Sequence, residues 1–168
     1  MPASEAQFHP VTQPAEIDRV INLAQVIWPQ HYAPIIGAAQ VRYMLDTYHS
    51  RAAINEELAT KGYSYFLVQL GGRDVGYLAV QPQADNLYLS KVYILSSERG
   101  KGLGRQSLAF AKAEALRQGL RRMTLIVNKG NTGTIAAYQR IGFVKTREVR
   151  ADIGQGFVMD DIAMEWQF

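Results

Sequence analysis

One turn constrains the fold of this 168-residue chain more than any other segment. The β-rich apolar run "LYLSKVYIL" (87–95) leads into the glycine-rich segment "RGKGLG" (99–104), and a helix-like pattern follows at once. The turn must therefore lie between the end of a strand and the start of a helix. The first N–H groups of a helix have no internal acceptors and lie at the positive end of its dipole. The sequence thus predicts an anion-binding turn.

The anion that this turn suits best is a pyrophosphate. Glycines let the backbone approach a phosphate closely, and Arg99, Lys101 and Arg105 add charged donors. The spacing excludes the phosphate loop of nucleotide hydrolases, because Leu95 stands where its first glycine is required. It also excludes the dinucleotide fingerprint and the glycine loop of kinases. The alternative is that the glycines serve only to make a tight turn.

The remaining patterns predict one domain over residues 1–168, with a mixed α/β (α+β) fold and one principal sheet. The expected order begins with a strand near Ala6–Val11 and a helix from Pro14 that Pro29 and Pro34 break. Two helices divided near Tyr48–Ser50 follow, with Ser50 as N-cap and Gly62 as stop, and then a hairpin at Gly71-Gly72 and the 87–95 strand. The next helix ends at Gly119 and has a narrow face made of Gly104, Leu108, Ala111 and Ala115; after it come a strand, a short helix ending at Gly142, and two closing strands.

Composition excludes several classes of function. The absence of cysteine removes disulfides, a thiolate nucleophile and cysteine-based zinc sites, and three widely spaced histidines predict no metal. A net charge of +3 comes with no aromatic platform interleaved with the charges of the basic blocks, so we expect no nucleic-acid partner. No apolar run has the roughly 20 residues that span a membrane, and the start lacks a signal-peptide pattern. We therefore expect a cytoplasmic protein with no membrane partner.

Two blocks in the right order resemble the GNAT superfamily of acyl-CoA-dependent N-acetyltransferases. The first is R-x-x-G-x-G (99–104) after "KVYI", and the second is "LIVNKGNTGTIAAYQRIGF" (125–143). The resemblance implies a mostly antiparallel sheet with a splayed middle strand, helices on both faces, and acetyl-CoA as the acyl donor.

The resemblance also assigns cofactor contacts. It implies that the main chain of the splayed strand bonds the pantetheine arm, that backbone amides of the turn hold the pyrophosphate, and that Asn131 contacts the cofactor beyond it. The implied strand residues are Val92, Tyr93 and Ile94, and those of the turn are Arg99, Gly100, Lys101, Gly102, Leu103, Gly104 and Arg105. Tyr138 matches the position whose hydroxyl protonates the departing thiolate, which we favour over the alternative that it is a core tyrosine on an amphipathic helix.

The catalytic base is not evident from the sequence. Relatives often carry a glutamate five residues before the asparagine, and Ile126 stands there in this chain. Ser90 and Lys91 are not obvious bases either. Deprotonation of the amine through ordered water, or by a carboxylate from the closing strand, stays open. Direct attack on the thioester is favoured over a covalent acyl-enzyme, because the chain has no cysteine.

The acceptor is predicted to be a small amine. The segments "VRYMLDTYHS" and "IGQGFVMDDIAMEWQF" resemble a bacterial branch of spermidine/spermine N-acetyltransferase-like proteins. A polyamine requires carboxylates and aromatic walls. The candidate contacts are Trp28, Tyr43, Asp46, Asp160 and Asp161, with Tyr48, Glu56 and Glu57 as weaker ones, each of which can also be a solvated or core residue. Two alternatives are a protein or lysine acetyltransferase and a non-catalytic acyl-CoA-binding module. A homodimer is left open.

Overall fold

The computed structural model describes residues 5–168. Residues 1–4, which belong to the stretch in which we looked for a signal-peptide pattern, lie outside the described residues. The strands are β1 (Gln7–Pro10), β2 (Ser64–Leu70), β3 (Arg73–Pro82), β4 (Leu87–Ile94), β5 (Arg122–Asn128), β6 (Val144–Gly154) and β7 (Phe157–Gln167). The helices are α1 (Pro14–Ile36), α2 (Ala38–Tyr48), α3 (Arg51–Thr60), α4 (Leu103–Arg117) and α5 (Thr132–Ile141), with a short 3-10 turn at Ser96–Glu98. Within residues 5–168, no helix is long and apolar enough to cross a membrane.

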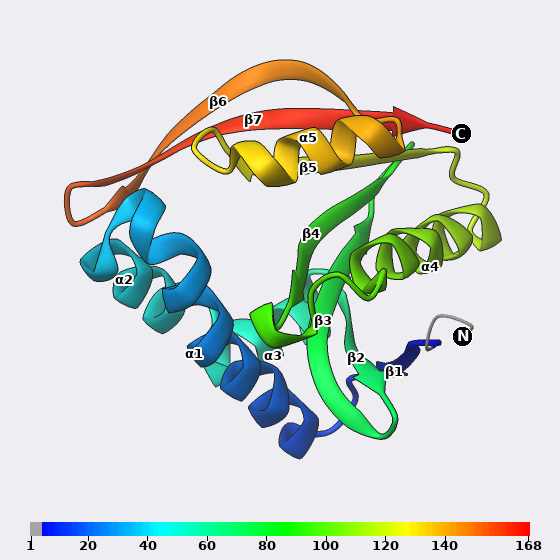
Figure 1. Ribbon diagram of the computed structural model, residues 1–168, viewed down its shortest axis with the longest axis horizontal. Coiled ribbons are helices and arrows are strands. Elements are labelled where there is room, and N and C mark those ends of the chain that lie inside the picture. Colours follow the sequence, from blue (N-terminus) through cyan, green and yellow to red (C-terminus); the bar gives the residue numbers. More distant parts are fainter. Residues whose placement is uncertain (1–4) are drawn as a thin grey trace.

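The strands form one sheet in the order β1-β2-β3-β4-β5-β7-β6. Every neighbouring pair is antiparallel except β4 and β5, which run parallel. These two strands pair only where Leu87 meets Met123 and Tyr88 meets Thr124, and then they diverge (Figure 1). The predicted fold class, a mostly antiparallel sheet with a splayed middle strand, is confirmed.

Helices cover both faces of the sheet, as predicted (Figure 1). On one face, α4 and α5 enclose a core that includes Leu78, Leu108 and Met123. On the other face, α1, α2 and α3 enclose a second core that includes Ile54 and Tyr77.

A β-bulge in β4 decides which side chains face which core. Ala79 of β3 pairs with Lys91 and Val80 pairs with Leu89, so Ser90 is the extra residue. The bulge reverses the alternation of side chains along the strand. Val92 therefore faces the same core as Leu89, whereas Lys91 faces the α1–α3 side.

The prediction that Pro29 and Pro34 break the first helix is wrong. Helix α1 continues through both prolines to Ile36. Each proline removes a helical hydrogen bond, a loss of about 3 kcal/mol in an isolated helix. However, α1 buries seven side chains against the sheet and its neighbours, at about 1.5–3 kcal/mol for each large apolar one. Tertiary packing therefore outweighs the local preference.

Other local predictions are confirmed. Helix α1 begins at Pro14, and the Ser50 hydroxyl caps α3 by accepting the N–H of Ala53 (3.1 Å). The hairpin turns at Gly71-Gly72, where φ is +58° and +79°, values that favour glycine. On α4 the predicted face is buried at Leu108, Ala111 and Ala115. Gly104 is exposed instead, and it lies on the cavity described next.

Candidate active site

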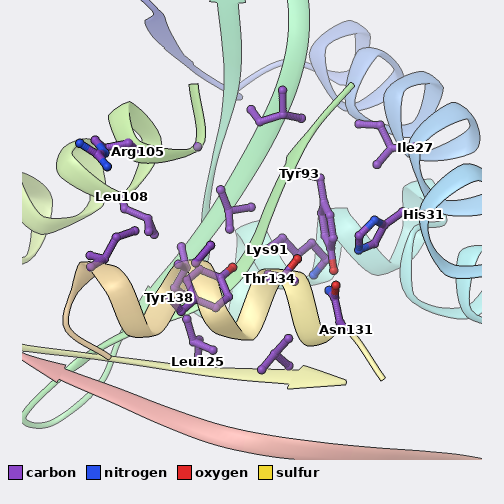
Figure 2. Close-up of a pocket in the computed structure, with 18 of the residues that line it drawn as sticks. Ile27, His31, Lys91, Tyr93, Arg105, Leu108, Leu125, Asn131, Thr134 and Tyr138 are labelled. Atoms are coloured by element: carbon purple, nitrogen blue, oxygen red, sulfur yellow. The ribbon is translucent and has the colours of Figure 1, made fainter. Parts of the chain in front are cut away.

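The divergence of β4 from β5 opens a groove of about 520 Å³ (Figure 2). Beyond Tyr88, no strand among the described residues pairs with the β5-facing edge of β4. Val92, Tyr93 and Ile94 line one wall, Leu125 and Ile126 line another, and α1 and α5 complete the groove. The groove therefore offers an unpaired strand edge to an extended ligand.

One end of the groove is the start of α4. Gln106 N–H donates to Gly102 O (3.0 Å) as the first bond of the helix, so the N–H groups just before it have no intrahelical acceptor. Gly100 and Gly102 have φ of +81° and +76°, which favours glycine at both positions. Gly104 and Arg105 line the groove at this end, and an added Cβ at Gly104 meets no atom within 4 Å. This end has the donors and the open space that a phosphate group requires.

The three predicted cations differ in their surroundings. Arg99 and Arg105 line the groove, and Arg99 approaches His31 Nδ1 at 3.3 Å. Lys101 is not among the lining residues; its ammonium donates to Glu98 Oε2 (2.5 Å), and this bond holds the pKa of the Glu98 carboxyl below its usual value. Gly100, Gly102 and the buried Leu103 shape the turn without lining the groove.

Tyr138 and Asn131 come from α5 and its N-terminus. The Tyr138 ring lies in the middle of the groove, and Asn131 lies at the far end near His31 (Figure 2). The Tyr138 ring contacts Phe143, with ring centroids 5.3 Å apart. Burial raises the pKa of the Tyr138 hydroxyl above its ordinary value, so it keeps its proton at neutral pH.

A second cavity of about 470 Å³ lies on the α1–α3 side of the sheet. Side chains from α1, α2, α3, β4, β5 and β7 line it. It shares five lining residues with the groove: Tyr32, Ser90, Lys91, Tyr93 and Ile126. At this junction the hydroxyls of Tyr32 and Tyr93 lie 3.2 Å apart. We call the second space the acceptor cavity.

The predicted substrate residues are only partly brought together. Trp28 and Asp161 line the acceptor cavity, as do Tyr48, Glu56 and Glu57. Tyr43, Asp46 and Asp160 line neither cavity. Tyr43 donates its hydroxyl to Ile153 O, Asp46 pairs with Arg42 (3.4 Å), and Asp160 pairs with Lys129 (3.2 Å).

A hydrogen-bonded chain supports one wall of the acceptor cavity. Trp28 Nε1 donates to the Tyr77 hydroxyl (3.0 Å), which lies 2.9 Å from His49 Nε2. Burial, with a smaller effect from the Lys91 charge, lowers the pKa of His49 to about 3, so the ring is neutral. Trp28 Nε1 can only donate, so among residues 5–168 His49 Nε2 is the one acceptor for the Tyr77 hydroxyl proton; with that proton donated to Nε2, the ring proton of His49 lies on Nδ1.

Asp161 is the buried carboxylate of the acceptor cavity. Its residue is 3% exposed, and its Oδ1 has no hydrogen-bond partner. Burial, with a smaller effect from Asp160, raises the pKa of Asp161 to about 6. In turn, its charge adds to the effect of burial in raising the pKa values of Tyr32 and Tyr88. A carboxyl with this pKa accepts a proton near neutral pH.

Lys91 is the buried cation at the junction. Its side chain is 10% exposed, and its Nζ lies 3.8 Å from Glu57 Oε2 and 3.3 Å from Ser90 Oγ. It also lies over the rings of Tyr63 and Tyr65, at 5.9 and 5.4 Å from their centroids. Burial lowers the pKa of Lys91, and the Glu57 carboxylate opposes this shift.

The sequence did not point to Tyr32, His49 or Lys91 as site residues, although all three line the acceptor cavity. The signal for Lys91 was available, because a lysine interrupts an apolar strand between Leu89 and Val92. Tyr32 and His49 gave no such signal, since their helices meet the sheet only in the folded chain. Among residues 5–168, no three histidine, aspartate or glutamate side chains gather as metal ligands do.

Curated relatives match parts of the chain. The uncharacterized N-acetyltransferase YjgM of Escherichia coli is 31% identical over 86 residues, which cover 49% of this chain and 52% of the relative. The L-methionine sulfoximine/L-methionine sulfone acetyltransferase of Pseudomonas aeruginosa is 36% identical over 66 residues, 39% of this chain and 38% of the relative. The chain thus spans about half or less of the length of these relatives.

Solved structures share the fold along the whole chain. The PaiA N-acetyltransferase of Thermoplasma acidophilum, in complex with coenzyme A, superposes with a TM-score of 0.80 at 15% identity, covering 98% of this chain and 99% of that one. A chimera of Vibrio cholerae spermidine N-acetyltransferase SpeG and hSSAT superposes with a TM-score of 0.68 at 15% identity, covering 98% and 96%. At such identities the likeness shows the fold alone.

The family itself is settled by a sequence model, that of the acetyltransferase (GNAT) family, which matches residues 20–143. That range contains the predicted turn at 99–104, the groove and Tyr138. The family identification made from the two sequence blocks is thereby confirmed. This chain belongs to the acetyltransferase (GNAT) family.

Proposed function

We propose that the protein transfers an acetyl group from acetyl-CoA to the primary amine of a small molecule. The observation that carries the proposal is the meeting of two cavities at Tyr32 and Tyr93. One cavity holds a proton donor, Tyr138, and the other holds a proton acceptor, Asp161. A donor and an acceptor on the two sides of a shared opening are what acyl transfer to an amine requires.

The groove fits coenzyme A in shape and chemistry. The unpaired edge of Val92–Ile94 matches the amide-rich pantetheine arm, which can bond to it as an added strand. The start of α4, with Gly104 and Arg105 on the groove, matches the pyrophosphate. Proteins of this fold have been crystallised with coenzyme A or acetyl-CoA, which supports the choice of ligand.

Acetyl-CoA supplies an acetyl group activated as a thioester. In the proposed reaction, Asp161 takes the proton that an ammonium group must lose before its nitrogen can attack the acyl carbon. The C–N bond forms and the C–S bond breaks, Tyr138 gives its hydroxyl proton to the departing sulfur, and the nitrogen releases its second proton to water as the amide forms. Exchange with solvent then restores both side chains. Asp161 is a carboxylate of the closing strand, one of the two sources of a base that the sequence leaves open.

The sequence-based prediction of a polyamine acceptor stays a prediction. A structural neighbour is a spermidine N-acetyltransferase chimera, and carboxylates line the acceptor cavity, which supports it. In contrast, a curated relative acts on L-methionine sulfoximine and L-methionine sulfone. The cavity volume of about 470 Å³ suits a small molecule in either case.

The test is release of free CoA from acetyl-CoA, measured with a panel of polyamines, amino acids and short peptides. Stimulation by small amines supports the proposal, and stimulation by peptides alone would replace it with a protein acetyltransferase. CoA binding without stimulation by any amine would favour a binding module. Tyr138→Phe is expected to lower turnover about 100-fold while CoA affinity, measured by calorimetry, is unchanged. Unchanged turnover would remove Tyr138 as the acid.

A further inference from the structure

The charges of the acceptor cavity carry an inference that rests on the proposed function and names the class of amine. Three carboxylates line the cavity, and a polyamine needs several of them unpaired. Glu56 already pairs with Lys61 (4.0 Å), and Glu57 already pairs with Lys91 (3.8 Å). Among the described lining residues, this leaves Asp161 as the carboxylate without a cation. The cavity therefore has a place for one ammonium group, beside Asp161.

Lys91 has the opposite need, because its ammonium group has fewer hydrogen-bond acceptors than N–H donors. An ammonium group has three N–H donors, and Ser90 Oγ accepts one of them at 3.3 Å. Glu57 Oε2, at 3.8 Å, attracts the charge but is too far for a hydrogen bond. The other oxygen of Glu57 accepts the hydroxyl of Tyr65 at 2.7 Å. A buried ammonium with unsatisfied donors is a binding site for an acceptor oxygen, above all a charged one.

A second unsatisfied donor belongs to the same cavity. The bonds from Trp28 to Tyr77 and from Tyr77 to His49 leave the proton of His49 on Nδ1, and this atom has no hydrogen-bond partner. Lys91 is near enough for its charge to act on the His49 ring. A ligand oxygen bound at Lys91 would therefore also supply an acceptor for the N–H at His49 Nδ1, directly or through a water molecule.

We propose that the acceptor is a zwitterionic amine, an amino-acid-like molecule whose ammonium group lies at Asp161 and whose carboxylate or other oxyanion lies at Lys91. Lys91 is then the residue that determines specificity, since it favours the oxyanion and repels a second ammonium group. A carboxylate in direct contact with Lys91 would be closer than Glu57 is and would dominate its interactions. A polyamine, in contrast, would place a cation against Lys91.

The experiment compares amines that differ at the far end only. One set is γ-aminobutyrate, n-butylamine and putrescine, and the other is the L-amino acids against their carboxamides. We expect the best substrate to be an anionic amine, with kcat/KM about 10- to 100-fold above its neutral and cationic counterparts. If neutral amines or diamines react as well as the anionic ones, the inference is wrong while the proposed function stands. If no amine stimulates CoA release, the proposed function fails and the inference falls with it.

Lys91→Met sharpens the test, because methionine keeps the length of the side chain and removes its charge. This change leaves Glu57 without its cation, so the cavity then has two unpaired carboxylates. We expect anionic amines to lose about 10- to 100-fold in kcat/KM and putrescine to gain relative to them. General damage to the fold would lower all rates together. Lys145→Met, on the exposed part of β6, is the matched control and should leave the substrate ranking unchanged.

Discussion

Replacing Asp161 by asparagine should raise the folding stability of the protein and lower its turnover at the same time. Burial holds the pKa of the Asp161 carboxyl at about 6, compared with 3.8 for a solvated aspartate. A difference of about 2 pKa units corresponds to about 3 kcal/mol of folding free energy lost at neutral pH. Asparagine removes the charge but leaves a buried amide short of partners, which costs about 1 kcal/mol. The expected net gain is about 2 kcal/mol.

The sign of this effect fixes its pH dependence. Between about pH 4 and pH 6 the folded protein holds a proton on Asp161 that the unfolded chain releases, so stability falls as the pH rises through this window. The penalty is fully present above about pH 6 and absent below the unfolded pKa. Asp160 contributes repulsion, and Lys129 is already paired with Asp160. The stabilisation by Asp161→Asn should therefore be largest at pH 8, and at pH 4 the amide's cost of about 1 kcal/mol should outweigh the charge penalty that is left.

The assay is thermal or urea unfolding of both proteins at pH 4, 6 and 8. For a chain of this size, about 2 kcal/mol corresponds to a rise in Tm of about 4–8 °C. The reasoning would be refuted by an equal Tm for both proteins at pH 8, or by a difference that does not shrink on acidification. In the same experiment, the wild-type kcat/KM should rise with pH through about 6, and the variant should lose this step.

Activity gives an independent check on the same residue. Ile126 lines both cavities, and it stands where the family resemblance of the sequence leads us to expect a glutamate. Adding Ile126→Glu to Asp161→Asn places a carboxylate on the neighbouring strand, and we expect it to restore part of the lost turnover. Ile126→Gln in the same background is the matched control and should restore none. Equal turnover of the two double variants would show that the loss does not arise from a missing base.

Three further predictions concern glycine and capping residues. Gly104→Val should leave the fold intact, because a Cβ at this position meets open space. It should lower CoA affinity, measured by calorimetry, at least about 10-fold, since the valine side chain enters the groove. Unchanged affinity would exclude the start of α4 as the phosphate site. Gly76→Ala should destabilise the protein by about 2 kcal/mol or more, as a Cβ there would lie 2.3 Å from Tyr93 O, and urea unfolding measures it. Ser50→Ala should cost about 1 kcal/mol through loss of the α3 cap, without changing turnover.

Much of the fold could be predicted because local signals and tertiary structure agree. The cap at Ser50 and the turn at Gly71-Gly72 are where backbone chemistry required them. The course of α1 through Pro29 and Pro34 could not be predicted, because the packing that stabilises it involves residues far away in the sequence. The reversal of side-chain alternation at Ser90 could not be predicted for the same reason, because it arises from the pairing of β4 with β3.

The two halves of the site differ in how far sequence could predict them. For the groove, the strongest sequence signal is one continuous turn, and three of its residues, Arg99, Gly104 and Arg105, line the groove. The acceptor half is assembled from six elements, so single carboxylates could not be ranked by pattern. Asp160 and Asp161 are adjacent in the chain, yet alternation along β7 puts one beside Lys129 and the other in the cavity.

The separation of β4 from β5 also leaves the sheet with a seam. Two residue pairs, at Leu87 and Tyr88, join β1–β4 to β5–β7 across the sheet. Backbone hydrogen bonding between the two parts of the sheet is thus weakest where a ligand would lie. An extended ligand that bonds to the edge of Val92–Ile94 would fill this gap as an added eighth strand. Amides of this edge should then exchange hydrogen more slowly. The co-substrate would act as a structural brace for the same sheet that holds it.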